Sequence, residues 1–583
     1  METSDQERPL LQLQTHPQAV GSEHTSDASV DINNRPALKH CTGNWRACFL
    51  IIGVEFCECL AFFSISTNLV TYLTTVLHES KVSAARNAST WVGASFVAPL
   101  FGAFIADTYW GRYWTIAVFL PVYIIAMLIL IASASLPVFS TCSNFGSNVH
   151  RPLVYLGLYL AAIAGGGVKP CTATFGADQF DPNDPVELAK KGSFFNWYFF
   201  LITTSSLLSG TVIVWLQENV GWGVGYVIPT VLMLFCFIAF LAGSRVYRFR
   251  KMGVSPIMSI FQVVAAAVRN RHLKLPDNNS LLHELTSSPP EADASHKINH
   301  TNQFRFFDKA AVAPSDNESR AQMSSWRLCT VTQVEELKML LQMFPTWASF
   351  VIYYAVSAQM QSTLVEQGMF MDNRVGSFAI PPASMSIVDI ISVLIWVPVY
   401  ETVLVPLARR FTGNDKGFTM PQRLGIGQAL SMLTMVYAAL LETRRLDVAE
   451  ANGLTDQSLP VPMSILWQAP LYLMHGAANV FGTIGVTEFF YDSGPVTMKS
   501  LCAALGQLAV ASGSIINSLV LSLVAVATTH GGAPGWIPDN LNEGHLDYFF
   551  WMMATLNLLN LALFVRYSMR CRGRGKTSLF IIQ

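Results

Sequence analysis

The order of apolar and polar residues divides this chain into long apolar windows separated by short polar segments. A window of about 20 mainly apolar residues is long enough to cross a bilayer as a helix. The pattern predicts twelve such helices, six before and six after one long polar segment. They cover residues 46–76, 88–107, 113–136, 151–172, 193–217, 222–244, 336–362, 383–407, 420–442, 462–490, 498–528 and 545–568.

The long polar segment, residues 245–335, contains acidic, Ser- and Pro-containing stretches typical of disordered linkers, and a basic amphipathic stretch that predicts a surface helix. Two sets of six spans joined in this way are typical of the major facilitator fold, in which two halves rock around a site at mid-membrane depth. We therefore predict an all-α membrane protein with that fold and twelve transmembrane helices in two six-helix halves. Its expected parts are a disordered cytoplasmic tail (1–43), a first bundle (44–244), a cytoplasmic central loop (245–335), a second bundle (336–568) and a cytoplasmic tail (569–583).

The distribution of Lys and Arg among the short loops predicts the orientation. The basic loops all fall on the side that also holds both chain ends, which we expect to be cytoplasmic. Arg444 and Arg445 are exceptions, because they lie in a loop expected on the opposite side. The stretch from Asp5 to Leu11 resembles an acidic dileucine sorting signal, so both the plasma membrane and the vacuolar membrane stay open as locations.

Composition supports a membrane protein and excludes several other classes. Only 13% of the residues are charged, against about 25% in a soluble domain, and 51% are hydrophobic. The net charge of −1 gives no reason to expect a nucleic-acid partner. The ten cysteines form no metal-binding spacing, and we see neither a nucleophile–base pair nor a phosphate-binding loop. We therefore expect no enzyme, no metal, no cofactor and no ATP-driven pump.

Three of the charged residues inside the apolar windows stand out. Glu55 and Glu58 are three residues apart in the first window, on one face of a helix, and Lys169 lies in the fourth. Charges at this depth are costly, so they are expected to be functional. They predict a secondary transporter of small solutes, with Glu55 and Glu58 carrying protons.

Several stretches resemble one family. The loop from Gly102 through Asp107 to Arg112 is similar to the short gating loop of the superfamily, so we expect Asp107 and Arg112 to control the conformation of the halves. The motifs FGADQFD (175–181), FFNWYFF (194–200), WVPVYE (396–401), QRLGIG (422–427) and EFFYDSGP (488–495) resemble the proton-dependent oligopeptide transporter family and, within it, the plant nitrate and peptide transporters. SAQMQSTLVEQGMFMD (357–372) is most similar to the di- and tripeptide subgroup.

The chain departs from that family at key positions. Where relatives carry Glu-x-x-Glu-Arg, it has Cys59 in place of the arginine. Burial and mutual repulsion then favour the protonated form of at least one of the two carboxyl groups, which would titrate as a coupled pair. Asn479 replaces the glutamate that binds the amino terminus of peptides, and Ser357 replaces the histidine of nitrate carriers.

The resemblance implies a substrate site made of Lys169, Asn479, Phe63 and Ser357. Trp467 is a further candidate to line the cavity, with packing or an interfacial anchor as its alternative role. Lys169 can either bind an anionic substrate group or form a structural salt bridge with the glutamates. His475 lies four residues before Asn479, on the same helical face, and is a candidate to restore a protonatable group to the second half. Packing is the alternative role for this histidine.

The leading hypothesis is a proton-coupled carrier of di- and tripeptides that works by alternating access in the lipid bilayer. A pH-independent facilitator, or a carrier of nitrate, a hormone or a specialised metabolite, stays open. From a different class, the chain could be a membrane sensor that keeps the fold without transport.

Overall fold

The structure is a computed structural model, and it describes most of the chain between residues 24 and 573. Within that range it leaves out residues 28, 80, 140–145, 251–255, 274, 276–281, 284–297, 299, 313–323, 325, 376–377, 381, 414–416, 530–534 and 539. The dileucine-like stretch at 5–11 and the linker-like stretches at 284–295 and 314–319 lie outside the described residues.

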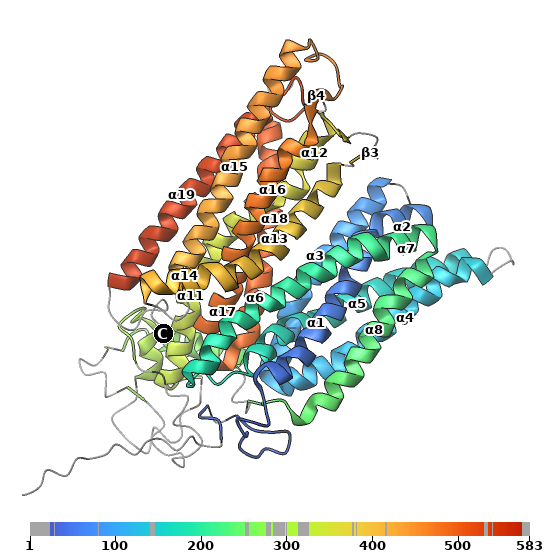
Figure 1. Ribbon diagram of the computed structural model, residues 1–583. Coiled ribbons are helices and arrows are strands. Elements are labelled where there is room, and N and C mark those ends of the chain that lie inside the picture. The colour runs from blue at the N-terminus through green and yellow to red at the C-terminus, as the bar shows by residue number, and fades with distance from the viewer. Residues whose placement is uncertain are drawn as a thin grey trace, which may run out of the picture.

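Two helical bundles make up the protein (Figure 1). The first bundle, blue to green, holds the helices that precede residue 246. They are α1 (Asn44–Ser66), α2 (Leu69–Thr75), α3 (Lys81–Ile105), η1 (Ala106–Trp110), α4 (Gly111–Phe139), α5 (Gly146–Ala177), α6 (Pro185–Leu208), η2 (Ser209–Ile213), α7 (Val214–Asn219), α8 (Trp222–Ala242) and η3 (Gly243–Arg245).

The second bundle, yellow to red, holds the elements that follow residue 330 (Figure 1). Its helices are α11 (Val331–Ser357), η7 (Ala358–Gln361), α12 (Thr363–Met369), η8 (Pro382–Met385), α13 (Ser386–Val399), η9 (Tyr400–Leu404), α14 (Val405–Thr412), α15 (Met420–Ala451), η10 (Ile465–Gln468), α16 (Ala469–Phe481), α17 (Thr483–Ser493), η11 (Val496–Met498), α18 (Lys499–Thr528) and α19 (Leu546–Gly573). Four short strands complete it: β1 (Met371–Asp372) pairs in parallel with β4 (Val461–Ser464), and β2 (Arg374–Val375) pairs antiparallel with β3 (Phe378–Ala379).

Each expected span falls on a helix or on consecutive helices, except that the first residues of the span 462–490 lie in strand β4. By length and composition alone, ten helical stretches among the described residues are long and apolar enough to cross a membrane. One of them, Thr90–Ser135, runs through α3, η1 and α4 and holds two of the expected spans. The span expected at 462–490 is divided between α16 and α17, which are too short individually. The structure therefore confirms an all-α membrane protein and is consistent with twelve crossings.

The central segment forms a small helical layer at one end of the bundles. Helix α9 (Pro256–Arg269) lies in the stretch expected to form a surface helix, and η6 (Phe307–Ala311) packs beside it. Val263 and Ala266 of α9 share an apolar cluster with Ala310 and with Val334 at the start of α11. We call the end of the molecule where this segment lies the loop end, and the opposite end the far end.

The described part of the amino-terminal tail packs on the first bundle at the loop end. The backbone N–H of Val30 donates to the carbonyl of Phe249 at 2.9 Å, and that of Ser26 donates to the Asp181 carboxylate at 2.8 Å. Within the part of the tail that the structure describes, backbone pairing with the segment after α8 holds these residues against the first bundle.

The two arginines that disagreed with the charge bias have different environments at the far end. Arg444 is exposed, with 71% of its side chain accessible, and lies 3.8 Å from Asp447. Arg445 is fully buried, and its guanidinium donates to Glu442 at 2.6 and 2.8 Å and to Asn542 at 2.5 Å. A buried, paired arginine contributes to the interior of its bundle, so it says little about orientation.

Candidate functional site

Glu58 lies in the middle of α1 and is completely buried. The ammonium of Lys169, on α5, lies 3.8 Å from Glu58 Oε1, and neither carboxylate oxygen of Glu58 has a hydrogen-bond partner among the described residues. Gly165, one turn before Lys169, makes room for this carboxylate: a Cβ there would lie 3.0 Å from Glu58 Oε1. The pair is therefore an ion pair in contact range without the hydrogen bond that would lock it.

Glu55 has separate partners, although it shares a helix face with Glu58. The hydroxyl of Thr172 donates to Glu55 Oε2 at 2.5 Å, and the Cys59 thiol donates weakly to Oε1 at 3.6 Å. Thr172 Oγ1 also lies 3.3 Å from the Tyr198 hydroxyl of α6. Cys59 thus occupies the family's arginine position and contacts one carboxylate with a weak donor in place of a charge.

The aromatic ring nearest to the Lys169 ammonium is that of Phe62, with Phe96 farther away. The Lys169 ammonium lies 3.4 Å from the centroid of the Phe62 ring, which stacks on Trp91. Phe63, the residue expected in the substrate site, makes an edge contact with the Phe62 ring and packs at the edge of the first bundle's core. The Phe62 ring offers an electron-rich face that stabilises the lysine, whose ammonium forms no hydrogen bond with any residue that the structure describes.

In the second bundle, Asn479 and His475 lie on one face of α16 as expected. Asn479 Nδ2 is 3.3 Å from His475 Nδ1, and Asn479 Oδ1 accepts from the Tyr353 hydroxyl at 3.3 Å and from the Thr483 hydroxyl at 3.1 Å. The same His475 nitrogen lies 2.9 Å from Asp389 Oδ1 in the first turn of α13. The structure therefore adds Asp389, which we did not expect, to the predicted pair.

The other two expected substrate residues have different surroundings. Ser357 ends α11, and its buried hydroxyl has no hydrogen-bond partner among the described residues. Trp467 lies in η10, before α16, with 58% of its surface exposed. Within the described part of the chain, no ring contact or side-chain hydrogen bond joins Trp467 to the other expected residues, so the structure does not bring it into this cluster.

Asp107 and Arg112 flank the junction of η1 and α4 at the loop end, and both contact the second bundle. Asp107 Oδ2 accepts from the backbone N–H of Leu501 at 2.9 Å, and Arg112 Nε donates to Ser500 Oγ at 3.0 Å. The two side chains are 3.8 Å apart. Arg112 also pairs closely with Asp178 of the FGADQFD motif.

Further contacts join the halves at the same end. Lys191 of α6 pairs with Asp492 at 2.6 Å, and Tyr491 donates to Asp178 at 2.6 Å. Asn196 donates to Glu401 at 2.7 Å and accepts from Arg423 at 2.8 Å.

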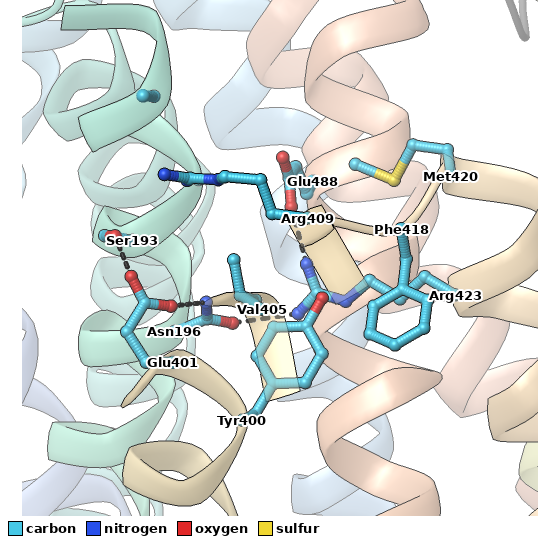
Figure 2. Close-up of a pocket in the computed structure, with 12 residues that line it drawn as sticks. Ser193, Asn196, Tyr400, Glu401, Val405, Arg409, Phe418, Met420, Arg423 and Glu488 are labelled. Carbon is cyan, nitrogen blue, oxygen red and sulfur yellow. Dashed lines mark hydrogen bonds and ion pairs between the residues drawn. The ribbon is translucent and has the colours of Figure 1, made fainter. Parts of the chain in front are cut away.

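Figure 2 shows the Asn196 contacts within a pocket between α6 and the second bundle, where Arg423 also reaches Glu488 at 2.7 Å. The loop end is therefore closed by side chains from both bundles. Our sequence reasoning missed this set, although Asp178, Asn196, Glu401, Arg423 and Glu488 all lie in the five motifs that suggested the family.

Comparisons with known proteins agree with this architecture. The family model described as "POT family" matches residues 113–537. The chain is 48% identical to Protein NRT1/PTR FAMILY 8.3 of Arabidopsis thaliana over 98% of its own length and 99% of the relative's.

Two solved structures are similar in fold at 20% identity. One is an auto-inhibited POT family peptide transporter (TM-score 0.56, covering 92% of this chain and 100% of that one), and the other is the POT family transporter PepTSo (TM-score 0.58, 91% and 99%). The major facilitator fold and the resemblance found in the sequence are thereby confirmed. This multi-pass membrane protein belongs to the POT family of transporters, in its plant NRT1/PTR branch.

Proposed function

We propose that this transporter carries di- and tripeptides together with protons by alternating access. The observation that carries the proposal is the Glu58–Lys169 pair, in which a buried carboxylate lies 3.8 Å from the ammonium with no hydrogen bond between them. Protonation of Glu58 removes the charge that holds Lys169. The lysine then has an unpaired positive charge for the carboxylate of a peptide.

Glu55 supports proton coupling from the neighbouring turn. Its carboxylate is 4% exposed and is held by Thr172, so a second titratable group lies beside the first without a permanent cation of its own. Proton coupling therefore requires no arginine at position 59. Lys169 supplies the positive charge that pairs with Glu58, and protonation of Glu58 releases this lysine.

The contacts between the bundles at the loop end account for the conformational change that alternating access requires. Because both bundles contribute to them, they must break before the central site can open at that end. For transport, substrate and proton must bind more tightly to the conformation in which these contacts are broken, because a ligand shifts a conformational equilibrium only through such a difference in affinity.

Uptake of a labelled dipeptide, at acid and neutral outside pH, tests the proposal in cells expressing the chain, Glu58→Gln and Glu218→Gln. Glu218 is an exposed carboxylate at the end of α7 and serves as the matched control. We expect uptake that rises in acid for the wild type and the control, and loss of that rise in Glu58→Gln. The His475→Ala variant shows whether this histidine also carries a coupled proton, since an unchanged pH profile would exclude it.

The remaining hypotheses correspond to other outcomes of the same assay. Dipeptide uptake that ignores pH in the wild type identifies a facilitator. Absence of dipeptide uptake, with protein confirmed in the membrane, overturns the peptide proposal and leaves another cargo or a sensor.

A further inference from the structure

Helix α9 of the central segment has apolar side chains on two different faces. One face is buried against η6 and the start of α11, where Val263 and Ala266 are inaccessible to solvent. The other face is exposed, and its residues follow one another at intervals of three, three and four positions, which places them along one stripe of the helix. They are Met258, Phe261, Val264 and Val268. A helix that is apolar all round is normally covered on all sides, so the exposed stripe is expected to have a partner.

The neighbours of α9 indicate its depth in the molecule. Besides α11, the helix packs beside η1 at the loop end of the first bundle. This π-helix belongs to the apolar stretch Thr90–Ser135, and its residues Tyr109 and Trp110 are exposed. Exposed Tyr and Trp at the end of a span are typical of the zone where hydrocarbon meets the lipid headgroups. Helix α9 therefore lies beside the part of a span that is expected to reach the bilayer interface.

The carboxyl-terminal end of α9 lies among basic groups. Arg269 is exposed and donates to the carbonyl of Trp326, the neighbour of the exposed Arg327, at 3.2 Å. The next basic residue, Arg271, is also exposed, and its carbonyl accepts from the ammonium of Lys309 at 2.5 Å. These hydrogen bonds gather four cationic side chains at one end of the apolar stripe.

No exposed acidic group offsets these charges among the residues that the structure describes between 256 and 330. The one carboxylate there, that of Asp308, is buried and pairs with Lys338 at 2.6 Å. An apolar face bordered by Lys and Arg is the composition of helices that lie in the plane of a membrane interface. Basic side chains at that depth attract anionic headgroups and can extend toward them while their aliphatic parts stay in apolar surroundings.

We propose that α9 is an interfacial helix that binds the anionic phospholipids of the bilayer leaflet at the loop end. The exposed stripe enters the leaflet, and Arg269 and Arg271 bind the headgroups. The proposal holds for any cargo, because it uses no residue of the central site. Since α9 contacts η1 of the first bundle and α11 of the second, lipid binding acts at the end where the two bundles meet.

The test uses the full-length protein in vesicles that contain phosphatidylcholine and phosphatidylserine in equal amounts. The photoreactive residue benzoylphenylalanine replaces Phe261, which is 61% exposed, and in a control chain it replaces Leu459, an exposed residue between α15 and β4 at the far end. After irradiation, mass spectrometry identifies what is attached. We expect lipid adducts at position 261, with the serine lipid favoured about fivefold, the factor expected for one basic residue at an anionic surface. Adducts at position 459 should stay near background.

Two kinds of variant separate the charged end from the apolar stripe. Arg269→Gln combined with Arg271→Gln should bring the ratio of the two lipids to about one, whereas Arg444→Gln, at an exposed arginine of the far end, should leave it unchanged. Val268→Gln should lower the total yield of lipid adducts about threefold to tenfold, because it removes apolar surface from the stripe. This valine is exposed, so the packing of α9 on α11 should persist.

Three results would overturn the proposal. Chains joined to one another through position 261, in place of lipid adducts, would make the stripe a contact with a second copy. A yield no higher than at position 459 would mean that the stripe faces water. Equal capture of the two lipids by the chain that keeps its arginines would exclude recognition of anionic headgroups.

Discussion

At the loop end, Lys191 and Asp492 join one bundle to the other at 2.6 Å, whereas at the far end Arg445 and Glu442 make a contact of the same length within one helix. The far-end contacts of the first bundle are also internal: Glu79 accepts from Tyr155 and Asn87 at 2.9 Å and pairs with Arg151 at 2.8 Å. Similar polar groups therefore have two tasks. Internal contacts keep each bundle rigid, and contacts between the bundles hold the molecule closed at the loop end.

The largest effect should come from breaking the internal contact of the second bundle. Arg445→Ala leaves Glu442 buried without its cation, which costs about 3–5 kcal/mol in the free energy of unfolding. Arg444→Ala, at the exposed neighbour, should change it by less than about 0.5 kcal/mol. Thermal unfolding of the purified variants measures both, and equal destabilisation would contradict the assignment of Arg445 to the interior.

An intermediate effect is expected at the loop end, on conformation. Lys191→Ala removes a partly buried ion pair between the bundles, and the population open at the loop end should rise about fivefold to tenfold, with little change in stability. Distances between spin labels on the loop ends of α6 and α17 report this shift. The control is Lys39→Ala, which breaks the contact of Lys39 with Asp184 inside the first half. A shift of the same size in the control would mean that the pair between bundles has no special role.

The smallest effect should follow from Glu79→Gln. The amide keeps one acceptor for Tyr155 and Asn87 but loses its charge opposite the exposed Arg151, so the free energy of unfolding should fall by about 0.5–1.5 kcal/mol. Because the contact is internal, the spin-label distances should stay as in the wild type. A changed distance distribution would show that the first bundle does not move as one body.

Much of the fold could be predicted because a bilayer imposes a length and a composition on every span. The same physics made Glu58 and Lys169 visible, since charges are rare in such windows. Arg445 shows where the Lys and Arg bias of the loops fails to predict the orientation, because that bias treats every arginine as a surface group. The packing shows that Glu442, one turn earlier, neutralises Arg445 inside the bundle.

The candidate site was less predictable for geometric reasons. Phe62 and Phe63 are adjacent in sequence, but helical phase brings only the first under the Lys169 ammonium. Asp389 begins a helix, where acidic residues are common, and its partner His475 lies 86 residues further along the chain. Contacts between helices of such separation depend on how the bundle packs, which a single sequence does not contain.

The lack of a side chain at Gly165 leaves room for the Glu58 carboxylate, so a small substitution at this position can affect the Glu58–Lys169 pair. A single methyl group there would lie 3.0 Å from Glu58 Oε1 and 3.3 Å from the Tyr123 ring, tighter than ordinary contacts. It would act as a wedge that moves the carboxylate relative to Lys169. A glycine-to-alanine polymorphism changes neither charge nor polarity, yet at this position it would alter the energy needed to separate the ion pair. A ranking of variants by chemical similarity alone would overlook it.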